Sequence, residues 1–417
     1  MAHRPKHLAR PSRRPWRRVA VLLVVAVLVV AAVAVAVWAQ RDDGTSGASP
    51  TTEPPATTSP AAPTTTAAPT TTAPPRRTAT IAFGGDVLIH QAVWEAARVD
   101  GGYDFGPMLA PIRPVLEAAD LALCHLEVTL ARAGEAPTGY PRFRAPAELA
   151  DALADAGFAG CSVASNHSLD HGEAGVVATL DALDAAGLGH VGTARSEAED
   201  RAPRRYDAGG IAVGHLSYSY GFNGLRPPAD KPWLVDEIDP GRILEDAAAL
   251  REAGAELIVV SLHWGNEYAH GVTAEQQEVA EALAAVPGAV DLVVGHHAHV
   301  VQPISKVGDL WVVWGLGNLL SNNSPRCCTV VATDGLVVTA RVGDREDGSG
   351  VEVQEITYTP IWNERDGFRV LPAAETLVRD VDPALAEALR ASWRRTDELV
   401  RSLDPDGALP LRPSATP

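Results

Sequence analysis

Residues 291–303 read DLVVGHHAHVVQP, and this stretch shows the pattern that recurs through the globular part of the chain. A short apolar run of strand length ends at Gly295, and three histidines follow within four positions. Because successive side chains of an extended segment point to opposite faces, His297 and His299 are expected on the same side. Imidazole nitrogens are common metal ligands. The stretch therefore predicts a strand whose end binds a metal ion.

The same order, an apolar run followed by a polar side chain, occurs at four other places. In each place the run has the length of a buried strand. The polar residues are Asp86, Glu127, the pair Asn166 and His167, and His263. Each alone has a simpler explanation: a turn at Gly85-Asp86, a helix cap at Asn166-His167, and a half-buried core histidine at His263. Together, two carboxylates, an amide and several imidazoles form the ligand set of a pair of divalent metal ions.

Strand and helix patterns alternate from residue 78 onward. Strands are predicted at 80–83, 121–126, 160–164, 211–218, 257–262, 292–294 and 310–314, and helices at 107–119, 146–156, 172–186, 241–252 and 274–285. This alternation predicts an α/β core whose sites lie at the carboxyl ends of strands. Strands at 329–332, 336–342 and 351–360 are expected to form a second sheet packed on the first. Residues 373–417 are predicted to form a C-terminal helix and a loose tail.

The first 40 residues have the composition of a membrane anchor. They include seven basic residues and no acidic one, and residues 19–38 are uncharged Val, Ala, Leu and Trp. Such a helix spans about 30 Å, the thickness of the hydrocarbon core of a bilayer. The charge distribution predicts a basic cytoplasmic N-terminus at 1–18 and a transmembrane signal anchor at 19–38. The alternative is a cleaved signal peptide, because 34–36 read AVA, although the apolar run is longer than such peptides use.

Residues 41–77 are predicted to be a disordered linker rich in Pro, Thr and Ala. Between residues 49 and 75 Glu53 is the only charged residue, and such a segment cannot bury enough apolar surface to offset its ordering entropy. Beyond residue 40 the chain holds 28 Lys and Arg against 52 Asp and Glu, a formal charge of −24. This balance excludes a nucleic-acid partner, which requires a basic face.

The four cysteines leave their bonding state open. Cys124 and Cys161 precede predicted site residues on strands that we expect to be neighbours. In an exported protein they either form a disulfide or remain buried thiols. The adjacent Cys327 and Cys328 have no pairing that the sequence can assign.

Six short motifs occur in the order found in one protein family. They are Gly84-Gly85-Asp86, Leu126-Glu127, and the runs 164–172 (ASNHSLDHG), 263–268 (HWGNEY), 295–303 (GHHAHVVQP) and 315–318 (GLGN). With them the chain resembles the bacterial capsule-synthesis CapA family of the poly-γ-glutamate type, which is similar to calcineurin-like metallophosphoesterases. The resemblance covers residues 79–325. It implies a four-layer α/β/β/α metallophosphoesterase-like sandwich, here at residues 78–372 behind the single transmembrane helix.

The resemblance also implies roles for individual residues. His167 would be the general acid, with Asp170 as its orienting partner, and Glu127 would bridge the metals. The metal ligands would be Asp86, Glu127, Asn166, His263, His297 and His299. Additional ligands or supporting residues would be His90, His125 and His296. His90 is included because the family's Asp-x-His becomes Asp86-Val87-Leu88 here. Arg142 and Arg144 are weaker candidates for binding an anionic substrate.

These residues lead to an expected function with an open alternative. The chain is expected to be a membrane-anchored, extracellular hydrolase of capsule synthesis with two divalent ions, Mn, Fe or Zn, acting on phosphoester or related envelope bonds. The alternative is a non-catalytic factor that binds the polymer or assists its assembly and export. A tethered adhesin with a decayed site is a third hypothesis. The expected partners are the membrane and an anionic envelope polymer or its synthase complex.

Overall fold

The computed structural model describes residues 76–417, which form a mixed α/β fold dominated by two β-sheets. The larger sheet has nine strands. Its strands β1, β4, β7 and β8 are parallel, β15 also runs parallel to β1, and β16 to β18 are antiparallel. In spatial order the strands are β18 (Val370–Pro372), β17 (Val351–Asn363), β16 (Asp334–Asp344), β1 (Thr78–Leu88), β4 (Leu121–Leu126), β7 (Gly160–Ser162) and β8 (Gly189–Val191), with β15 (Asn318–Ser321) beside β1 and β19 (Leu411–Pro413) beside β17.

The smaller sheet has six strands, and its four central strands are parallel. In spatial order they are β13 (Ile304–Val307), β14 (Leu310–Val313), β12 (Leu292–His296), β11 (Leu257–His263), β10 (Ile211–Ser219) and β9 (Arg205–Ala208). The pairs β2 (Arg98–Val99) with β3 (Gly102–Tyr103) and β5 (Thr129–Leu130) with β6 (Arg144–Ala145) are short ribbons outside both sheets.

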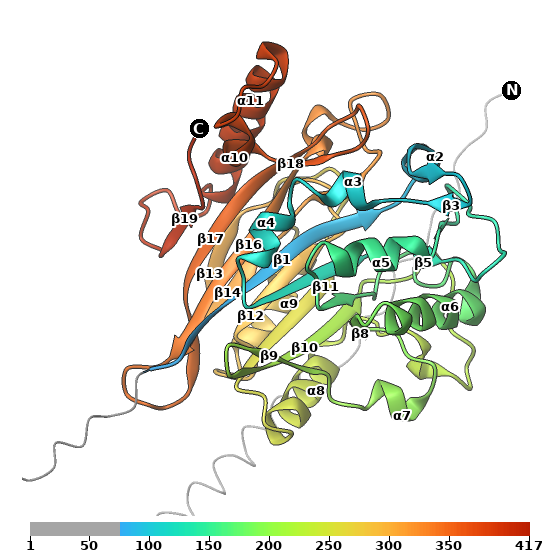
Figure 1. Ribbon diagram of the computed structural model, residues 1–417. Coiled ribbons are helices and arrows are strands. Elements are labelled where there is room, and N and C mark those ends of the chain that lie inside the picture. The colour runs from blue at the N-terminus through green and yellow to red at the C-terminus, as the bar shows by residue number, and fades with distance from the viewer. Residues whose placement is uncertain (1–75) are drawn as a thin grey trace, which may run out of the picture. The chain divides into compact units, whose positions relative to one another are not determined.

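Apolar clusters show how the sheets and helices are layered. One cluster lies between the two sheets and joins Ile81 and Phe83 of β1 to Val259 of β11 and Val294 of β12. A second packs the outer face of the larger sheet against helices, and a third does so for the smaller sheet. Figure 1 shows helices α3, α4 and α5 on the viewer's side of β1. Helices α8 and α9 lie by the smaller sheet. The helices are α2 (Gln91–Ala96), α3 (Gly106–Leu109), α4 (Arg113–Glu117), α5 (Glu148–Asp155) and α6 (Gly172–Ala185) on one side, and α8 (Pro240–Glu252) and α9 (Ala274–Ala284) on the other.

The helix ends follow local sequence signals. The Thr273 hydroxyl accepts a hydrogen bond from the Gln276 amide, and the Gln276 side chain accepts one from the Thr273 amide, so a capping box begins α9. The Asp239 carboxylate accepts hydrogen bonds at the start of α8. The helix predicted at 107–119 is instead split into α3 and α4, because Pro111 and Pro114 interrupt helical hydrogen bonding.

The C-terminal region differs most from expectation. Strands β16 and β17 extend the larger sheet beside β1 and do not form a separate sheet. Residues 329–332 are not a strand, because η2 (Val330–Thr333) is a 3-10 helix. Helices α10 (Ala373–Leu377) and α11 (Pro383–Val400) pack against β17, and the tail expected to be loose pairs with β17 through β19.

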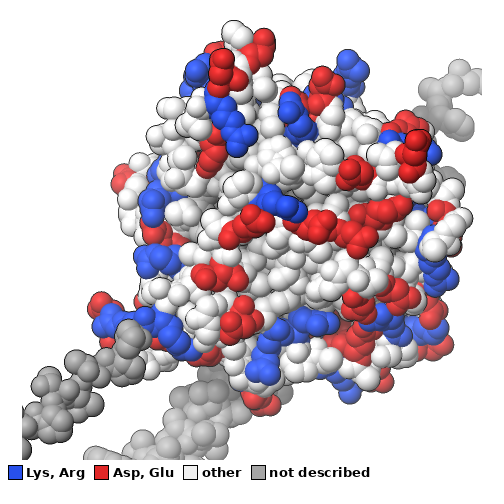
Figure 2. All heavy atoms as spheres, viewed as in Figure 1, with Lys and Arg blue, Asp and Glu red and all other residues white. Residues whose placement is uncertain are grey.

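The predicted cytoplasmic segment, the transmembrane anchor and nearly all of the linker lie outside the described residues. Among the helices of residues 76–417, none is long and apolar enough to cross a membrane. On the face drawn in Figure 2, acidic and basic side chains are interspersed, without a continuous basic field in that part of the described chain. Both cysteine pairs form disulfides, Cys124 with Cys161 across β4 and β7, and Cys327 with Cys328.

Two glycines of the site motifs allow close packing of the backbone. Gly85 and Gly295, directly before Asp86 and His296, lie inside strands and do not have positive φ. A Cβ at Gly85 would overlap the carbonyl oxygen of Gly317, and one at Gly295 would overlap that of Trp314. These contacts bring the strand ends together at the candidate site.

Gly295→Ala is therefore expected to lower the free energy of unfolding by about 3 kcal/mol, because the added methyl group can be accommodated only by moving the backbone. Gly271→Ala is the matched control, since its Cβ would meet open space. Chemical denaturation of both variants measures the difference. A Gly295→Ala variant as stable as the control would show that the close approach is not required.

Candidate metal centre

The strand ends of both sheets bring the predicted ligands together. Asp86 ends β1, and Glu127 and Asn166 follow β4 and β7 of the larger sheet. His263 ends β11 of the smaller sheet, and the two histidines of the quoted stretch follow β12. The full predicted set is buried, at most 4% exposed: Asp86, Glu127, Asn166, His263, His297 and His299.

The carboxylate of Glu127 is the central feature of this cluster. It is 1% exposed, and neither of its oxygens has a hydrogen-bond partner. Its Oε1 lies 3.6 Å from His299 Nε2 and 3.8 Å from His263 Nε2. His297 Nδ1 is likewise buried without a partner. A buried carboxylate is costly unless it is paired or binds a metal, so these free atoms fit divalent cations.

Four groups of side chains have ligand atoms that all lie within 4.8 Å of one another. Glu127 belongs to two of them, one on the Asp86 side and one on the His263 side, which is the geometry of a bridging ligand. The groups are Asp86, Glu127 and His299; Glu127, His263 and His297; Asp86, His125 and His296; and Glu267, His297 and His299. The residues present therefore fit divalent cation binding, with Glu127 able to contact a cation on either side.

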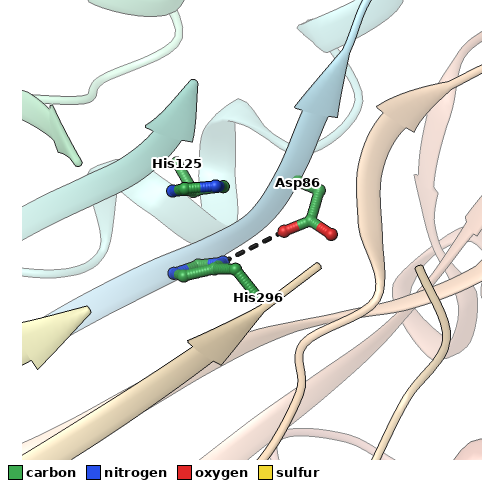
Figure 3. A group of neighbouring side chains, drawn as sticks. All are labelled: Asp86, His125 and His296. Carbon is green, nitrogen blue, oxygen red and sulfur yellow. Dashed lines mark hydrogen bonds and ion pairs between the residues drawn. The ribbon is translucent and has the colours of Figure 1, made fainter. Parts of the chain in front are cut away.

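Histidines and backbone hold Asp86 in place. His296 Nδ1 lies 3.1 Å from Asp86 Oδ1, and His299 Nδ1 lies 3.2 Å from Asp86 Oδ2. The His297 amide donates to Asp86 Oδ2 at 3.1 Å. Figure 3 shows the rings of His296 and His125 stacked beside Asp86, with centroids 4.0 Å apart. His296 thus faces the carboxylate and holds it in position.

His125 acts on the other side of the centre. Its Nε2 lies 2.9 Å from His263 Nδ1, and its Nδ1 lies 2.8 Å from Ser162 Oγ. The second nitrogen of His263, Nε2, lies 3.0 Å from Asn166 Oδ1. Because both nitrogens of His125 are engaged, it orients the ring of His263, whose Nε2 faces Glu127.

The pKa shifts describe three neutral imidazoles and one protonated imidazole around the carboxylates. Burial holds the pKa of His125 and His263 well below the usual value and lowers that of His297 to about 3. Burial also raises the pKa of Glu127 to about 7. For His299, burial is outweighed by the negative charges of Glu127 and Asp86, which raise its pKa to about 9. Neutral imidazole nitrogens are the form that binds a metal.

The histidine stretch differs in one respect from the sequence expectation. His297 and His299 do not continue the extended strand, because both have positive φ, 84° and 55°. Such a conformation is uncommon for side chains other than glycine and costs free energy. Their ring centroids lie 6.0 Å apart, so the turned backbone still brings both rings to the same centre.

His167 and Asp170 form a pair beside the ligands. His167 Nδ1 lies 2.7 Å from Asp170 Oδ2, which also accepts a hydrogen bond from the Phe143 amide at 2.6 Å. The Phe143 ring meets the His167 ring edge-on at 4.7 Å. Asp170 therefore fixes the ring orientation and leaves Nε2 of His167 available to a substrate.

Two further predictions are placed differently. His90 belongs to none of the four ligand groups; its Nδ1 lies 3.1 Å from the Leu88 carbonyl oxygen, and burial lowers its pKa to about 4. Arg144 lies 3.4 Å from Glu135 and donates to the Ala136 carbonyl, while Arg142 is exposed. The structure thus shows no shared contact of the two arginines with the ligand set.

Several residues near the centre were not predicted individually. Asn318 Oδ1 lies 3.0 Å from His299 Nδ1, and the Tyr220 ring lies 4.6 Å from that of His297. Asn223 Nδ2 lies 3.4 Å from His167 Nδ1, and Glu267 joins one ligand group. Asn318 and Glu267 stand inside the quoted motifs, which was the available signal. Tyr220 and Asn223 follow β10 without a recognisable pattern.

The comparisons with known proteins identify the family. The family described as bacterial capsule synthesis protein PGA_cap matches residues 80–323. The chain belongs to this family, which confirms the resemblance inferred from the motifs.

Individual relatives are more distant. Capsule biosynthesis protein CapA of Bacillus anthracis is 28% identical over 42% of each chain. PGA biosynthesis protein CapA of Bacillus subtilis is 24% identical over 57% of this chain and 62% of the relative. A probable polyglutamine synthesis accessory protein of Mycobacterium tuberculosis is 27% identical over 54% of this chain and 61% of the relative. The chain thus spans less than two thirds of these relatives.

Solved structures resemble the chain more weakly. The calcineurin-like phosphoesterase YfkN of Bacillus subtilis is 13% identical, with a TM-score of 0.43 over 78% of this chain and all of that one. NAD nucleotidase of Haemophilus influenzae is 10% identical, with a TM-score of 0.42 over 80% of this chain and 68% of that one. Similarity this low says nothing about the reaction of the present chain.

Proposed function

We propose that the chain is a metal-dependent hydrolase of capsule synthesis that cleaves a phosphoester or related bond in the cell envelope. The observation that supports this most strongly is Glu127, whose buried carboxylate has no hydrogen-bond partner and belongs to two adjoining ligand groups. A buried carboxylate without hydrogen bonds, surrounded by imidazole nitrogens, is suited to binding cations.

Each side chain has a defined task in this proposal. Asp86 and His299 would hold one cation, Asn166, His263 and His297 the other, and Glu127 both. Bound divalent ions supply an activated water and polarise the scissile group. His167, oriented by Asp170, would donate the proton to the leaving oxygen. His125 and His296 would keep His263 and Asp86 in their orientations.

Two arginines linked to the segment near His90 are candidates for binding an anionic substrate. Arg365 donates to the carbonyl oxygen and the side-chain oxygen of Asn322, at 3.0 and 2.6 Å. The Asn322 amide lies 3.4 Å from His90 Nδ1. Burial and the charge of the nearby Arg326 lower the pKa of Arg365. Neither arginine forms an ion pair within the described chain. We propose these two, with Arg142 and Arg144 as weaker candidates, as the binding groups for a negatively charged polymer.

The proposed location is the outer face of the cell membrane. Residues 19–38 would be the single-pass anchor, with a cytoplasmic N-terminus and the linker at 41–77 holding the catalytic domain away from the bilayer. The Cys124–Cys161 disulfide is consistent with an oxidising compartment.

The experiment that tests the function measures metal content and hydrolysis together. The full chain in detergent, supplied with Mn, Fe or Zn, is expected to bind two ions per chain and to hydrolyse 4-nitrophenyl phosphate or its diester. Removal of the ions by a chelator should abolish hydrolysis, and their return should restore it. A chain that binds no metal under these conditions would contradict the hydrolase.

One observation favours the alternative of a non-catalytic factor. Leu88 stands where the resembling phosphoesterases have a histidine ligand, and its side chain is buried in the apolar cluster under the helices. Metal-independent binding of an anionic polymer by the full chain, without turnover, would support an assembly or export role.

A further inference from the structure

A cavity of about 320 Å³, separate from the metal centre, lies at the edge of the smaller sheet. Its walls come from the end of β8, from α7 (Glu197–Asp200) and the segment after it, from β10 and from α8. None of its lining residues belongs to the four ligand groups of the metal centre. It is therefore a separate feature of the described chain.

The floor of this cavity is a gap in the pairing of β10. Strand β9 pairs with β10 only from Ile211 to Gly214. Beyond that point the His215 amide donates to the Arg204 carbonyl at 3.3 Å and the Ser219 amide to the Asp236 carbonyl at 2.9 Å. Alternate amides of a strand point the same way, so the Ser217 amide points to the same edge of β10 as the amides of His215 and Ser219. At this edge the Ser217 amide has no backbone hydrogen bond to another described element.

Two buried side chains on the floor have unused polar atoms. His215 and Ser217 are 1% and 2% exposed, and His215 Nδ1 and Ser217 Oγ have no hydrogen-bond partner. His215 Nε2 lies 3.0 Å from Ser261 Oγ, so only Nδ1 of this ring is free. Buried polar atoms are nearly always paired, and unpaired ones beside a cavity indicate a missing ligand or water.

One wall of the cavity carries more negative than positive charge. Arg242 is shared by three carboxylates, Asp246 at 2.5 Å, Asp200 at 3.1 Å and Asp236 at 3.9 Å. The Tyr218 hydroxyl also donates to Asp246 at 2.8 Å. A single guanidinium does not neutralise three carboxylates. Asp236 lies farthest from Arg242, and burial together with the charge of Asp200 raises the pKa of Asp236 to about 8. This wall is suited to a cationic group.

Another wall carries a free positive charge. Arg204 is half-buried, lines the cavity and forms no ion pair within the described chain. Its charge, added to burial, lowers the pKa of the neighbouring His190. The cavity therefore offers an unpaired guanidinium as well as three carboxylates that share a single arginine.

We propose that this cavity binds a small zwitterion with one ammonium and one carboxylate, the chemistry of a free amino acid. The ammonium would lie against Asp236 and Asp200, and the carboxylate against Arg204 and the Ser217 amide. Ser217 Oγ and His215 Nδ1 would bind the remaining polar atoms. The volume holds roughly ten water molecules at about 30 Å³ each, so a ligand with about as many heavy atoms fits.

Calorimetry with matched probes on the full chain in detergent tests the proposal. The probes are ω-amino acids from glycine to 6-aminohexanoate, with butylamine and butyrate as single-charge controls. At least one ω-amino acid is expected to bind saturably and at least ten-fold more tightly than either control. Absence of binding by all ω-amino acids, or equal affinity for butylamine or butyrate, would overturn the proposal.

Two variants assign the binding to this cavity. Asp236→Asn and Arg204→Gln are each expected to weaken ω-amino acid binding at least ten-fold, while Asp309→Asn, an exposed aspartate without an ion pair in the described chain, should have no effect. Thermal unfolding checks that each variant is folded. If Asp236→Asn does not fold, Arg204→Gln, at a partly exposed position, still tests the site. Unchanged affinity in a folded variant rejects the site. Metal content should be unchanged in all three, so the outcome is independent of the proposed hydrolase.

Discussion

Glu127→Gln is expected to lower the metal content from two ions per chain to one or none, and to reduce hydrolysis more than about 100-fold, beyond the range typical of residues that only support ligands. Gln keeps the size of the side chain but removes the negative charge that both ligand groups share. The change also removes a buried carboxylate that makes no hydrogen bond and whose pKa is raised to about 7 by burial, so the metal-free variant should be at least as stable as the metal-free wild type. Mass spectrometry for metals and thermal unfolding with and without chelator measure the two effects.

Glu364→Gln is a suitable control for this change. Glu364 is 9% exposed, but its carboxylate has its own partner in Arg369 at 2.5 Å. The control should retain both metal ions while losing stability, the opposite of Glu127→Gln. If Glu127→Gln retained two ions, the bridging role and the ligand geometry built around it would be incorrect.

His167→Gln is expected to reduce kcat by about 10²–10⁴-fold, the usual contribution of a general acid, with the metal content unchanged. Among the described contacts of His167, the strong one is to Asp170, and its ring belongs to none of the ligand groups. The loss should be largest for substrates with poor leaving groups, because these need the proton most. Activated nitrophenyl esters should lose less.

Asp170→Asn separates the acid from its positioning residue. Asn can still contact the ring but removes the carboxylate charge beside Nδ1, so a loss in kcat for poor leaving groups with unchanged metal content is expected. His171→Gln, at the next position, is the control. If kcat for poor leaving groups were unchanged in His167→Gln, another group would be the acid.

The fold was predictable where local patterns decide it. Apolar runs of strand length gave β4, β11 and β12 nearly residue by residue, because burial on both faces leaves little choice of side chain. Strand pairing was less accessible. The position of β16 beside β1, and the pairing of β19 with β17, depend on contacts between segments hundreds or tens of residues apart, which no local pattern encodes.

The candidate site was predictable to a similar extent. Strand-end residues such as Asp86 and Glu127 converge because parallel strands present their carboxyl ends at one edge. The sequence proposed His125 and His296 as additional ligands or supporting residues but did not decide between these roles, because they depend on the distance between two packed sheets. The positive φ of His297 and His299 replaced the extended conformation that a His-x-His pattern suggests.

The distribution of the ligands over two sheets has a consequence for the lifetime of the protein. Asp86, Glu127 and Asn166 come from the larger sheet, and His263 and the two histidines after β12 from the smaller one. Cations held there would fasten the sheets to each other and bind only the folded chain. At a free concentration 100 times the dissociation constant, one such ion would add about 2.7 kcal/mol to stability. Metal scarcity would then increase degradation by proteases as well as inactivate the centre.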